Sequence, residues 1–183
     1  MEAEFTNHWR MIKMSKIYYI SDLHLFHNKV LQLSNRPFSD IEEMHQTIIK
    51  NWNQTVTSKD VVYIIGDLGM YHAKKITQIL RSLPGRKVLI KGNHDIENLK
   101  YRPLRECFVD IKNMDTIQDQ GQKIVLCHYP FEEWNGYYRG HYHIHGHIHE
   151  KQDSIYRISR RYNASVDVIG YTPRDFNWFK ENF

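Results

Sequence analysis

The stretch KIYYISDLH, residues 16–24, places a run of apolar, aromatic and β-branched side chains directly before an aspartate and a histidine. The pattern recurs in VVYIIGD at residues 61–67, KVLIKGNHD at residues 87–95 and KIVLCH at residues 123–128. Short, continuous apolar runs of this kind are typical of strands that are buried on both faces. We therefore predict four buried strands, each followed at once by polar side chains.

Helical patterns separate the first three of these runs. Apolar side chains recur at helical spacing after the first run, at Ile41, Met44, Ile48, Ile49, Trp52 and Val56. Ser39 and Glu42 match a capping box at the start of this helix. A second helix is expected from about residue 73 to residue 83, where a Pro-Gly pair ends it. Alternating strands and helices predict an α/β fold with right-handed crossovers.

The second half of the chain has a different pattern. Beyond about Arg105 helical signals fade, and strands and loops are expected to dominate. Near the C-terminus, Thr172 and Pro173 match the N-cap and first position of a short final helix. We expect residues 1–15 to be an N-terminal extension and residues 16–183 to form a single domain.

Composition excludes several classes of protein. Of the 183 residues, 41% are hydrophobic and 25% are charged, as in ordinary globular domains. No apolar run approaches the roughly 18 residues that span a membrane, and the N-terminal segment lacks the apolar core of a secretory signal. The presence of only two cysteines, Cys107 and Cys127, argues against a disulfide framework and favours a cytoplasmic location. The net charge is +4, and the lysines and arginines are scattered along the chain and form no long basic tract that would indicate nucleic-acid binding.

The polar residues after the strands predict a site. In open α/β sheets ligands bind beyond the carboxyl ends of the strands, and these ends supply Asp22, His24, Asp67, Asn93, His94 and His128. A further stretch, HYHIHGHIHE at residues 141–150, would present His147 and His149 from a turn at Gly146. Each motif alone has an ordinary interpretation as a turn or cap. Together they are better explained by a common site.

The residue types in this site indicate its chemistry. Nitrogen and oxygen ligands without thiolate suit divalent first-row metals such as Mn, Fe or Zn. One ion does not need so many ligands. Two ions about 3.5–4 Å apart, bridged by one carboxylate, would use them all.

The ordered motifs resemble those of the calcineurin-like metallophosphoesterase superfamily, in particular its small, capless bacterial and phage members. They are DLH (22–24), GDLG (66–69), GNHD (92–95), the histidine of CHYP (127–130) and GHIH (146–149), and the resemblance covers residues 16–183. It implies two mixed β-sheets packed face to face, with helices on the outer faces.

The resemblance also implies a role for each motif residue. One metal ion would be held by Asp22, His24, Asp67 and His149. The other would be held by Asp67, Asn93, His128 and His147, so that Asp67 bridges the two ions. His94 corresponds to the catalytic histidine of the family, which does not bind metal. Mn²⁺ is the expected metal, with Fe, Zn, Ni and Co as alternatives.

Two such cations make hydroxide available near neutral pH and offset charge on a phosphate. A metal-activated hydroxide would attack a phosphate mono- or diester, while His94 stabilises the transition state or protonates the leaving oxygen. The Ser/Thr protein phosphatases of the superfamily carry an aspartate three residues after the bridging one, which orients their histidine. Met70 stands at that place here, so this kind of phosphatase is disfavoured and the orientation of His94 is left open.

Two alternatives to a phosphoesterase of small phosphorylated substrates stay open. A nuclease or nucleic-acid end-processing enzyme of the same superfamily would need a strand-tracking groove, and nucleotides are possible substrates too. A non-catalytic metal-binding scaffold is the second alternative, although His94 and the full ligand set are retained. His27, Arg36 and Arg139 are candidate substrate contacts because each lies near a motif, and Arg36 could equally shape the start of the following helix.

Other side chains near the motifs have two interpretations. The histidines before the Gly146 turn either orient ligands and contact substrate or are satisfied imidazoles on a half-buried strand, and they are His141, His143 and His145. Nearby aromatic residues either stack on a substrate ring or fill the core, and they are Trp134, Tyr137, Tyr138 and Tyr142.

Overall fold

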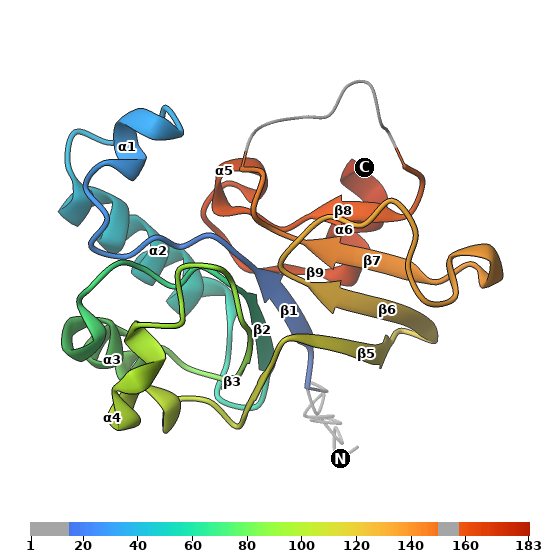
Figure 1. Cartoon of the computed structure of the whole chain (residues 1–183), viewed down its shortest axis with the longest axis horizontal. Helices are drawn as coiled ribbons and strands as arrows, with labels where there is room; N and C mark the ends of the chain where they lie inside the picture. Colours follow the sequence, from blue (N-terminus) through green and yellow to red (C-terminus); the bar gives the residue numbers. More distant parts are fainter. Residues whose placement is uncertain (1–14, 150–157) are drawn as a thin grey trace, which may run out of the picture.

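The computed structural model describes residues 15–149 and 158–183. The described strands form two sheets (Figure 1). The first contains, in spatial order, β4 (Asp110–Lys112), β3 (Arg86–Ile90), β2 (Val61–Ile65), β1 (Ile17–Ile20) and β9 (Arg174–Asp175). The second contains β5 (Met114–Asp119), β6 (Gln122–Cys127), β7 (Tyr142–His145) and β8 (Arg161–Asn163).

Both sheets are mixed. Strands β1 to β4 run parallel, and β9 pairs antiparallel with β1. In the second sheet β5 pairs antiparallel with β6, whereas β6, β7 and β8 run parallel. The four strands expected from the apolar runs are β1, β2, β3 and β6, so this prediction is confirmed.

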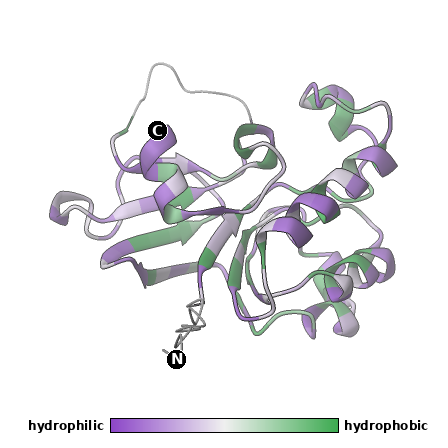
Figure 2. Cartoon of the chain, turned by 180° about the vertical axis from the view of Figure 1, so that it is seen from behind, coloured by the Kyte–Doolittle hydropathy of each residue, from purple (hydrophilic) through white to green (hydrophobic). Residues whose placement is uncertain are grey.

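The described helices are α1 (Val30–Leu33), α2 (Ile41–Thr55), α3 (Ala73–Ser82), α4 (Arg102–Arg105), α5 (Val166–Ile169) and α6 (Phe176–Asn182), with 3₁₀ turns η1 (Asn98–Lys100) and η2 (Tyr137–Arg139). The two helices expected between the first three apolar runs are confirmed as α2 and α3. Figure 1 shows α2 and α3 on the side of the first sheet that faces away from the second. Seen from behind in Figure 2, the strands carry much of the hydrophobic colour, whereas the helices carry both hydrophilic and hydrophobic colours.

The core lies between the sheets and under α2 and α3. Buried side chains from both sheets belong to one cluster, among them Ile64 of β2 and Leu126 of β6. The Tyr19 hydroxyl donates to Asp119 Oδ2 at 2.8 Å and joins β1 to β5 across this core. The predicted class, an α/β fold with two mixed sheets packed against each other, is confirmed.

The start of α2 differs from the prediction by one residue. Asp40, not Ser39, is the N-cap, and its carboxylate accepts the backbone N–H of Glu43 at 2.8 Å. The Glu43 carboxylate in turn accepts the backbone N–H of Ser39 at 2.8 Å. The capping interaction therefore uses Glu43 in place of Glu42, because two acidic residues in sequence fit the same pattern.

The C-terminal helix also begins later than predicted. Its N-cap is Asp175, which accepts the backbone N–H of Trp178, and not Thr172. The cause is tertiary: Arg174 and Asp175 first pair with β1 as strand β9. The expected N-terminal extension lies outside the described residues except for Ser15. Among the described helices, none has the length and apolar character needed to cross a membrane.

Candidate metal centre

The polar residues that follow the strands meet where the ends of both sheets come together. The N–H of Asp22 donates to Gly66 O at 3.0 Å, and the N–H of Gly146 donates to His128 O at 3.0 Å. The N–H of His147 donates to Asp22 Oδ2 at 3.0 Å, so the segment after β7 is bound to the segment after β1. Parallel pairing within each sheet thus brings five strand ends to one place.

The backbone is strained at this site. Left-handed conformations occur at five candidate ligands, with φ of 56° at Asp22, 47° at His24, 57° at Asp67, 73° at His147 and 51° at His149. Residues other than glycine seldom adopt this region, and such strain gathers at functional sites. Surrounding contacts must therefore hold these segments.

Asp95 supplies several of those contacts. Its buried carboxylate accepts the backbone N–H groups of Asp67 at 3.0 Å, Leu68 at 2.8 Å and Gly92 at 2.8 Å. It therefore clamps the segment after β2 to the segment after β3. In the sequence Asp95 is the last residue of the GNHD motif, directly after Asn93 and His94. Nothing in that position indicated that its carboxylate would bind three backbone N–H groups.

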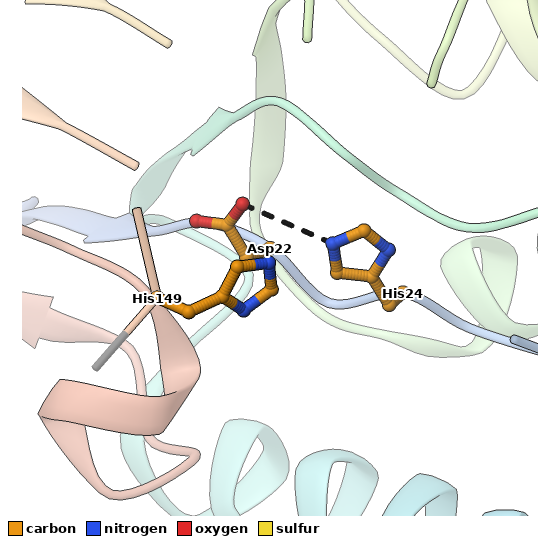
Figure 3. A group of neighbouring side chains, drawn as sticks. All are labelled: Asp22, His24 and His149. Carbon is orange, nitrogen blue, oxygen red and sulfur yellow. Dashed lines mark ion pairs between the residues drawn. The ribbon is translucent and has the colours of Figure 1, made fainter. Parts of the chain in front are cut away.

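Asp22, His24 and His149 form one group of potential ligands, whose donor atoms all lie within 4.8 Å of one another (Figure 3). Nε2 of His24 lies 4.0 Å from Asp22 Oδ1. It is buried and has no hydrogen-bond partner within the described part of the chain, whereas Nδ1 lies 3.4 Å from Nδ1 of His27. Burial lowers the pKa of His24 to about 2, so the ring is neutral. A buried, unpartnered imidazole nitrogen is what a metal ion would satisfy.

A second group surrounds His128. Its Nε2 lies 3.1 Å from Asn93 Oδ1, which also lies 3.1 Å from Nδ1 of His147. Nδ1 of His128 donates to Ile65 O at 2.8 Å, so Nε2 is the atom that faces the site. His128 is fully buried, whereas Asn93 and His147 are exposed. This half of the site opens to solvent.

Asp67 lies between the two groups. Its Oδ2 is 3.6 Å from Nε2 of His24 and 3.4 Å from Nε2 of His128. Burial alone would raise the pKa of the Asp67 carboxyl, but the hydrogen bond with His128 lowers it to about 2. Burial would likewise lower the pKa of His128, yet its contact with Asp67 raises it to about 9. A shared carboxylate, neutral imidazole and only nitrogen and oxygen donors fit divalent first-row cations.

Two glycines leave room for the carboxylates. A Cβ atom at Gly146 would overlap Asp22 Oδ2 and Ser21 Oγ. A Cβ atom at Gly92 would overlap Asp67 Oδ1. The close approach of these side chains to the backbone therefore requires glycine at both positions.

His94 lies at the side of the site. Its backbone N–H donates to Asp67 Oδ1 at 3.0 Å, and its ring centroid is 5.6 Å from that of His24 and 6.4 Å from that of His27. No carboxylate within residues 15–149 or 158–183 hydrogen-bonds to the ring, consistent with Met70 at the position noted above. Ring packing against neighbouring histidines is what the structure provides to orient it.

A pocket of about 490 Å³ adjoins the site. It is lined by His24, His27, Val30, Leu33, Ser34, Asn35, His94 and His149. Two of the three candidate substrate contacts lie outside this lining. Arg36 is buried with its guanidinium bound within the protein, and Arg139 is exposed at the N-terminal end of β7, opposite the end that carries His147. The Arg139 side chain donates to Asn135 Oδ1 at 3.0 Å.

The structure brings in two side chains that had no sequence motif. Asp167 of α5 lies 2.6 Å from Nδ1 of His149. His45 of α2 accepts the backbone N–H of Phe26 at Nε2, at 3.0 Å, and so fixes the segment that follows His24. Both are polar residues inside short apolar patterns. Only an unexplained buried polar position could have drawn attention to them.

The remaining histidines and aromatics lie mainly in structural contacts. His143 is buried and stacks on Phe131 at 5.1 Å, and Trp134 packs against it at 5.3 Å. His145 is buried with Nδ1 2.9 Å from Gly146 O. The three tyrosines of the set lie outside the pocket lining: Tyr142 packs on Phe176, Tyr137 packs on Trp134, and Tyr138 is exposed. His141 also lies outside it, with Nδ1 3.0 Å from Asn135 O.

Known proteins share this sequence and architecture. The family model of the calcineurin-like phosphoesterase superfamily domain matches residues 15–164. The uncharacterized protein MJ1445 of Methanocaldococcus jannaschii is 39% identical over 167 residues, which cover 88% of each chain. The Gene 66 protein of Mycobacterium phage L5 is 38% identical over 85 residues, which cover 45% of this chain and 41% of that protein. The crystal structure of AQ665, a protein of unknown function from Aquifex aeolicus, matches with a TM-score of 0.74 and 26% identity over 92% of this chain and 100% of that chain. The chain therefore belongs to the calcineurin-like phosphoesterase superfamily.

Proposed function

We propose that this protein is a dinuclear metal-dependent phosphoesterase that acts on small phosphate mono- or diesters. The observation that carries the proposal is the position of Asp67, whose Oδ2 lies within 3.6 Å of Nε2 of His24 and 3.4 Å of Nε2 of His128. One carboxylate oxygen thus faces two separate groups of potential ligands. Such sharing suits two cations and exceeds what one cation needs.

The proposed ligands divide as the two groups do. One cation would be held by Asp22, His24, Asp67 and His149, and the other by Asp67, Asn93, His128 and His147. When bound, the cations lower the pKa of water and offset the charge of the phosphoryl oxygens. Mn²⁺ is the proposed metal, and Fe, Zn, Ni and Co also accept this donor set.

His94 is the proposed catalytic residue. It lines the pocket beside His24, and its own backbone N–H holds Asp67 Oδ1 at 3.0 Å. An imidazole in this position can donate a proton to the leaving oxygen as the ester bond breaks. This backbone hydrogen bond also holds His94 close to the shared Asp67 carboxylate.

The pocket favours a substrate with a small, uncharged organic group. Val30 and Leu33 of α1 supply an apolar wall, and Ser34 and Asn35 supply polar atoms. Neither lysine nor arginine is among its described lining residues. We expect the phosphate to face the histidines and the organic group to lie against α1, and His27 to contact the substrate from the pocket wall.

Hydrolysis of 4-nitrophenyl phosphate and bis-(4-nitrophenyl) phosphate by metal-stripped protein reloaded with Mn²⁺ tests the proposal. His94→Ala should retain both metals and lose about 10²- to 10⁴-fold in turnover, the usual contribution of a positioned acid or base. His72→Ala, an exposed histidine outside the pocket lining, is the matched control and should keep full turnover. The preferred ester distinguishes phosphatase from phosphodiesterase. Fully active His94→Ala would refute the role of His94, and protein that binds no stoichiometric metal would refute the proposal.

A further inference from the structure

We propose that Asp167 is a positioning residue for His149, and that its buried ion pair with Arg36 ties this histidine to the backbone that carries Asp22. Neither Asp167 nor Arg36 belongs to one of the five motifs that supply the candidate ligands. The link to metal binding rests on the proposed function. The orientation of the imidazole is a property of the metal-free protein and can be tested without it.

Asp167 determines which nitrogen of His149 faces the site. Asp167 Oδ2 lies 2.6 Å from Nδ1 of His149, and the Ser34 hydroxyl lies 3.3 Å from the same nitrogen. The Ser165 hydroxyl donates to Asp167 Oδ2 at 3.0 Å, and the Tyr171 hydroxyl to Oδ1 at 3.4 Å. An ionised carboxylate only accepts hydrogen bonds, so Nδ1 of His149 carries the ring proton. Nε2 is then left with its lone pair.

The charge of Asp167 is itself held by its surroundings. Its side chain is fully buried, which alone would raise the pKa of the carboxyl, but the hydrogen bond with His149 and the charge of Arg36 lower it. Arg36 contacts both oxygens of this carboxylate: its Nε forms an ion pair with Oδ1 at 2.7 Å, and a terminal nitrogen donates a hydrogen bond to Oδ2 at 2.9 Å. Contact with both oxygens fixes the orientation of the carboxylate.

Arg36 extends the contact to the segment after β1, which carries Asp22 and His24. The nitrogen that donates to Asp167 Oδ2 also donates to Asp22 O at 2.8 Å, and the second terminal nitrogen donates to Leu23 O at 3.2 Å. One guanidinium thus joins α5 to the segment after β1, between Asp22 and His24. A buried ion pair is a poor source of stability, because similar apolar residues often serve as well. Its value here lies in fixing two ligand-bearing segments relative to each other.

The contacts of this pair are confined to one half of the site. Described hydrogen bonds connect it to Asp22 and His149, but not to the second group of Asn93, His128 and His147. Loss of Asp167 should therefore weaken one metal position and spare the other. Partners of this kind typically contribute about 10- to 100-fold to metal affinity.

Nuclear magnetic resonance of ¹⁵N-labelled, metal-free protein gives the first readout. Long-range ¹H–¹⁵N spectra near pH 7.5 should show the His149 ring protonated at Nδ1, with the signal assigned by its absence from His149→Gln. Asp167→Asn should shift this ring toward a mixture of tautomers. Asp119→Asn, a half-buried carboxylate that accepts from Tyr19 across the core, is the control and should leave the His149 signal unchanged. A ring protonated at Nε2 in the unaltered protein would overturn the proposal.

Mn²⁺ titration followed by electron paramagnetic resonance gives the second readout. Asp167→Asn should weaken one of two binding events by about 10- to 100-fold and leave the other unchanged, as His149→Gln should do more strongly. If Asp167→Asn does not fold, the double variant Arg36→Met, Asp167→Asn removes both buried charges together and should weaken the same event. Equal weakening of both events, or of neither, would overturn the selective role. Absence of Mn²⁺ binding in the unaltered protein would refute the proposed function, while the tautomer result would still decide the orientation by Asp167.

Discussion

Nε2 of His24 lies 3.6 Å from Oδ2 of Asp67, buried and without a hydrogen-bond partner among the described residues. The same oxygen lies 3.4 Å from Nε2 of His128, whose pKa is shifted in the opposite direction. Burial lowers the pKa of His24 to about 2, whereas contact with Asp67 overcomes burial and raises that of His128 to about 9. One carboxylate therefore serves two imidazoles in different electrostatic states, as expected for the common point of two ligand groups.

Asp67→Asn should bind fewer metal ions than the unaltered protein. The amide keeps an oxygen that can accept the N–H of His94, so the loop geometry is retained, but the negative charge between the two ligand groups is lost. We expect less than one Mn²⁺ per chain at equilibrium and turnover near background. Metal content after gel filtration in micromolar Mn²⁺ measures this. Asp119→Asn is the control and should bind as the unaltered protein does.

The two metal positions should release their ions at different rates. Asp22 and His24 are buried, whereas Asn93 and His147 are exposed, so a chelator reaches the second half more readily. Mixing Mn²⁺-loaded protein with excess EDTA should give two phases of release. His147→Ala should lose the fast phase and keep the slow one. Release of both equivalents in a single phase, in protein loaded with two, would contradict this asymmetry.

Gly146→Ala should impair metal binding through a steric effect alone. The added Cβ would overlap Asp22 Oδ2 and Ser21 Oγ, and both are buried, so the Asp22 carboxylate must move. We expect at least 10-fold weaker Mn²⁺ binding, in line with the usual effect of displaced ligand partners of about 10- to 100-fold. Isothermal titration calorimetry measures the change.

Gly121→Ala is the matched control for this steric effect. Gly121 has a positive φ of 77° and nothing within 4 Å of its added Cβ, so the variant carries backbone strain without a clash. It should lose about 1 kcal/mol or more of stability and bind Mn²⁺ normally. Equal binding by Gly146→Ala and Gly121→Ala would show that the close approach at Gly146 does not matter.

Much of the sheet architecture and of the ligand cluster could be predicted because both depend on local pattern. Continuous apolar runs mark buried strands, and Asp22, Asp67 and His128 follow such runs directly. Parallel pairing of β1 and β2 then brings Asp22 and Asp67 to one edge, and contact between the two sheets adds His128. The position of a helix start was less predictable, since Asp40 and Ser39 both fit an N-cap and the following residues, Glu42 and Glu43, both fit the acidic position of the capping box.

Contacts between distant segments could not be predicted from pattern. Arg36 follows α1 and Asp167 lies in α5, 131 residues apart, yet they meet inside the protein. No periodicity relates the two, so Arg36 looked like a residue available to a substrate. Similarly, the η2 turn follows the site-proximal His128 in sequence, but the chain runs back to the N-terminal end of β7 and places Arg139 there. Sequence proximity to a motif is thus a poor guide to spatial proximity.

The stability of the metal-free protein should decrease as the pH is lowered, because the buried ring of His143 must stay neutral in the folded state. The ring is fully buried, and burial lowers its pKa from 6.5 to about 4 despite backbone contacts. Nδ1 donates to Val125 O at 3.0 Å, and Nε2 accepts the N–H of Phe131 at 3.2 Å. Protonation would turn that acceptor into a donor. Arg161 also disfavours a charge there.

The sign of the pH effect follows from these pKa values. Above pH 6.5 the ring is neutral in both states and its contribution to stability is complete. Between pH 6.5 and about pH 4, His143 is protonated in the unfolded chain but stays neutral in the folded protein, so stability is lost as the pH falls. This ring accounts for a loss of roughly 2 kcal/mol by pH 5.

Urea unfolding of metal-free protein at pH 7.5 and pH 5 measures the effect. Gln at position 143 does not titrate but can still donate and accept hydrogen bonds, so His143→Gln should lose less stability between the two pH values than the unaltered protein does. His72→Gln replaces an exposed histidine and should retain the full loss. The buried His45 lies on another element, contributes equally to all three proteins and cancels in the comparison. If His143→Gln and the unaltered protein lost stability in parallel, His143 would not be the group that the folded protein keeps neutral.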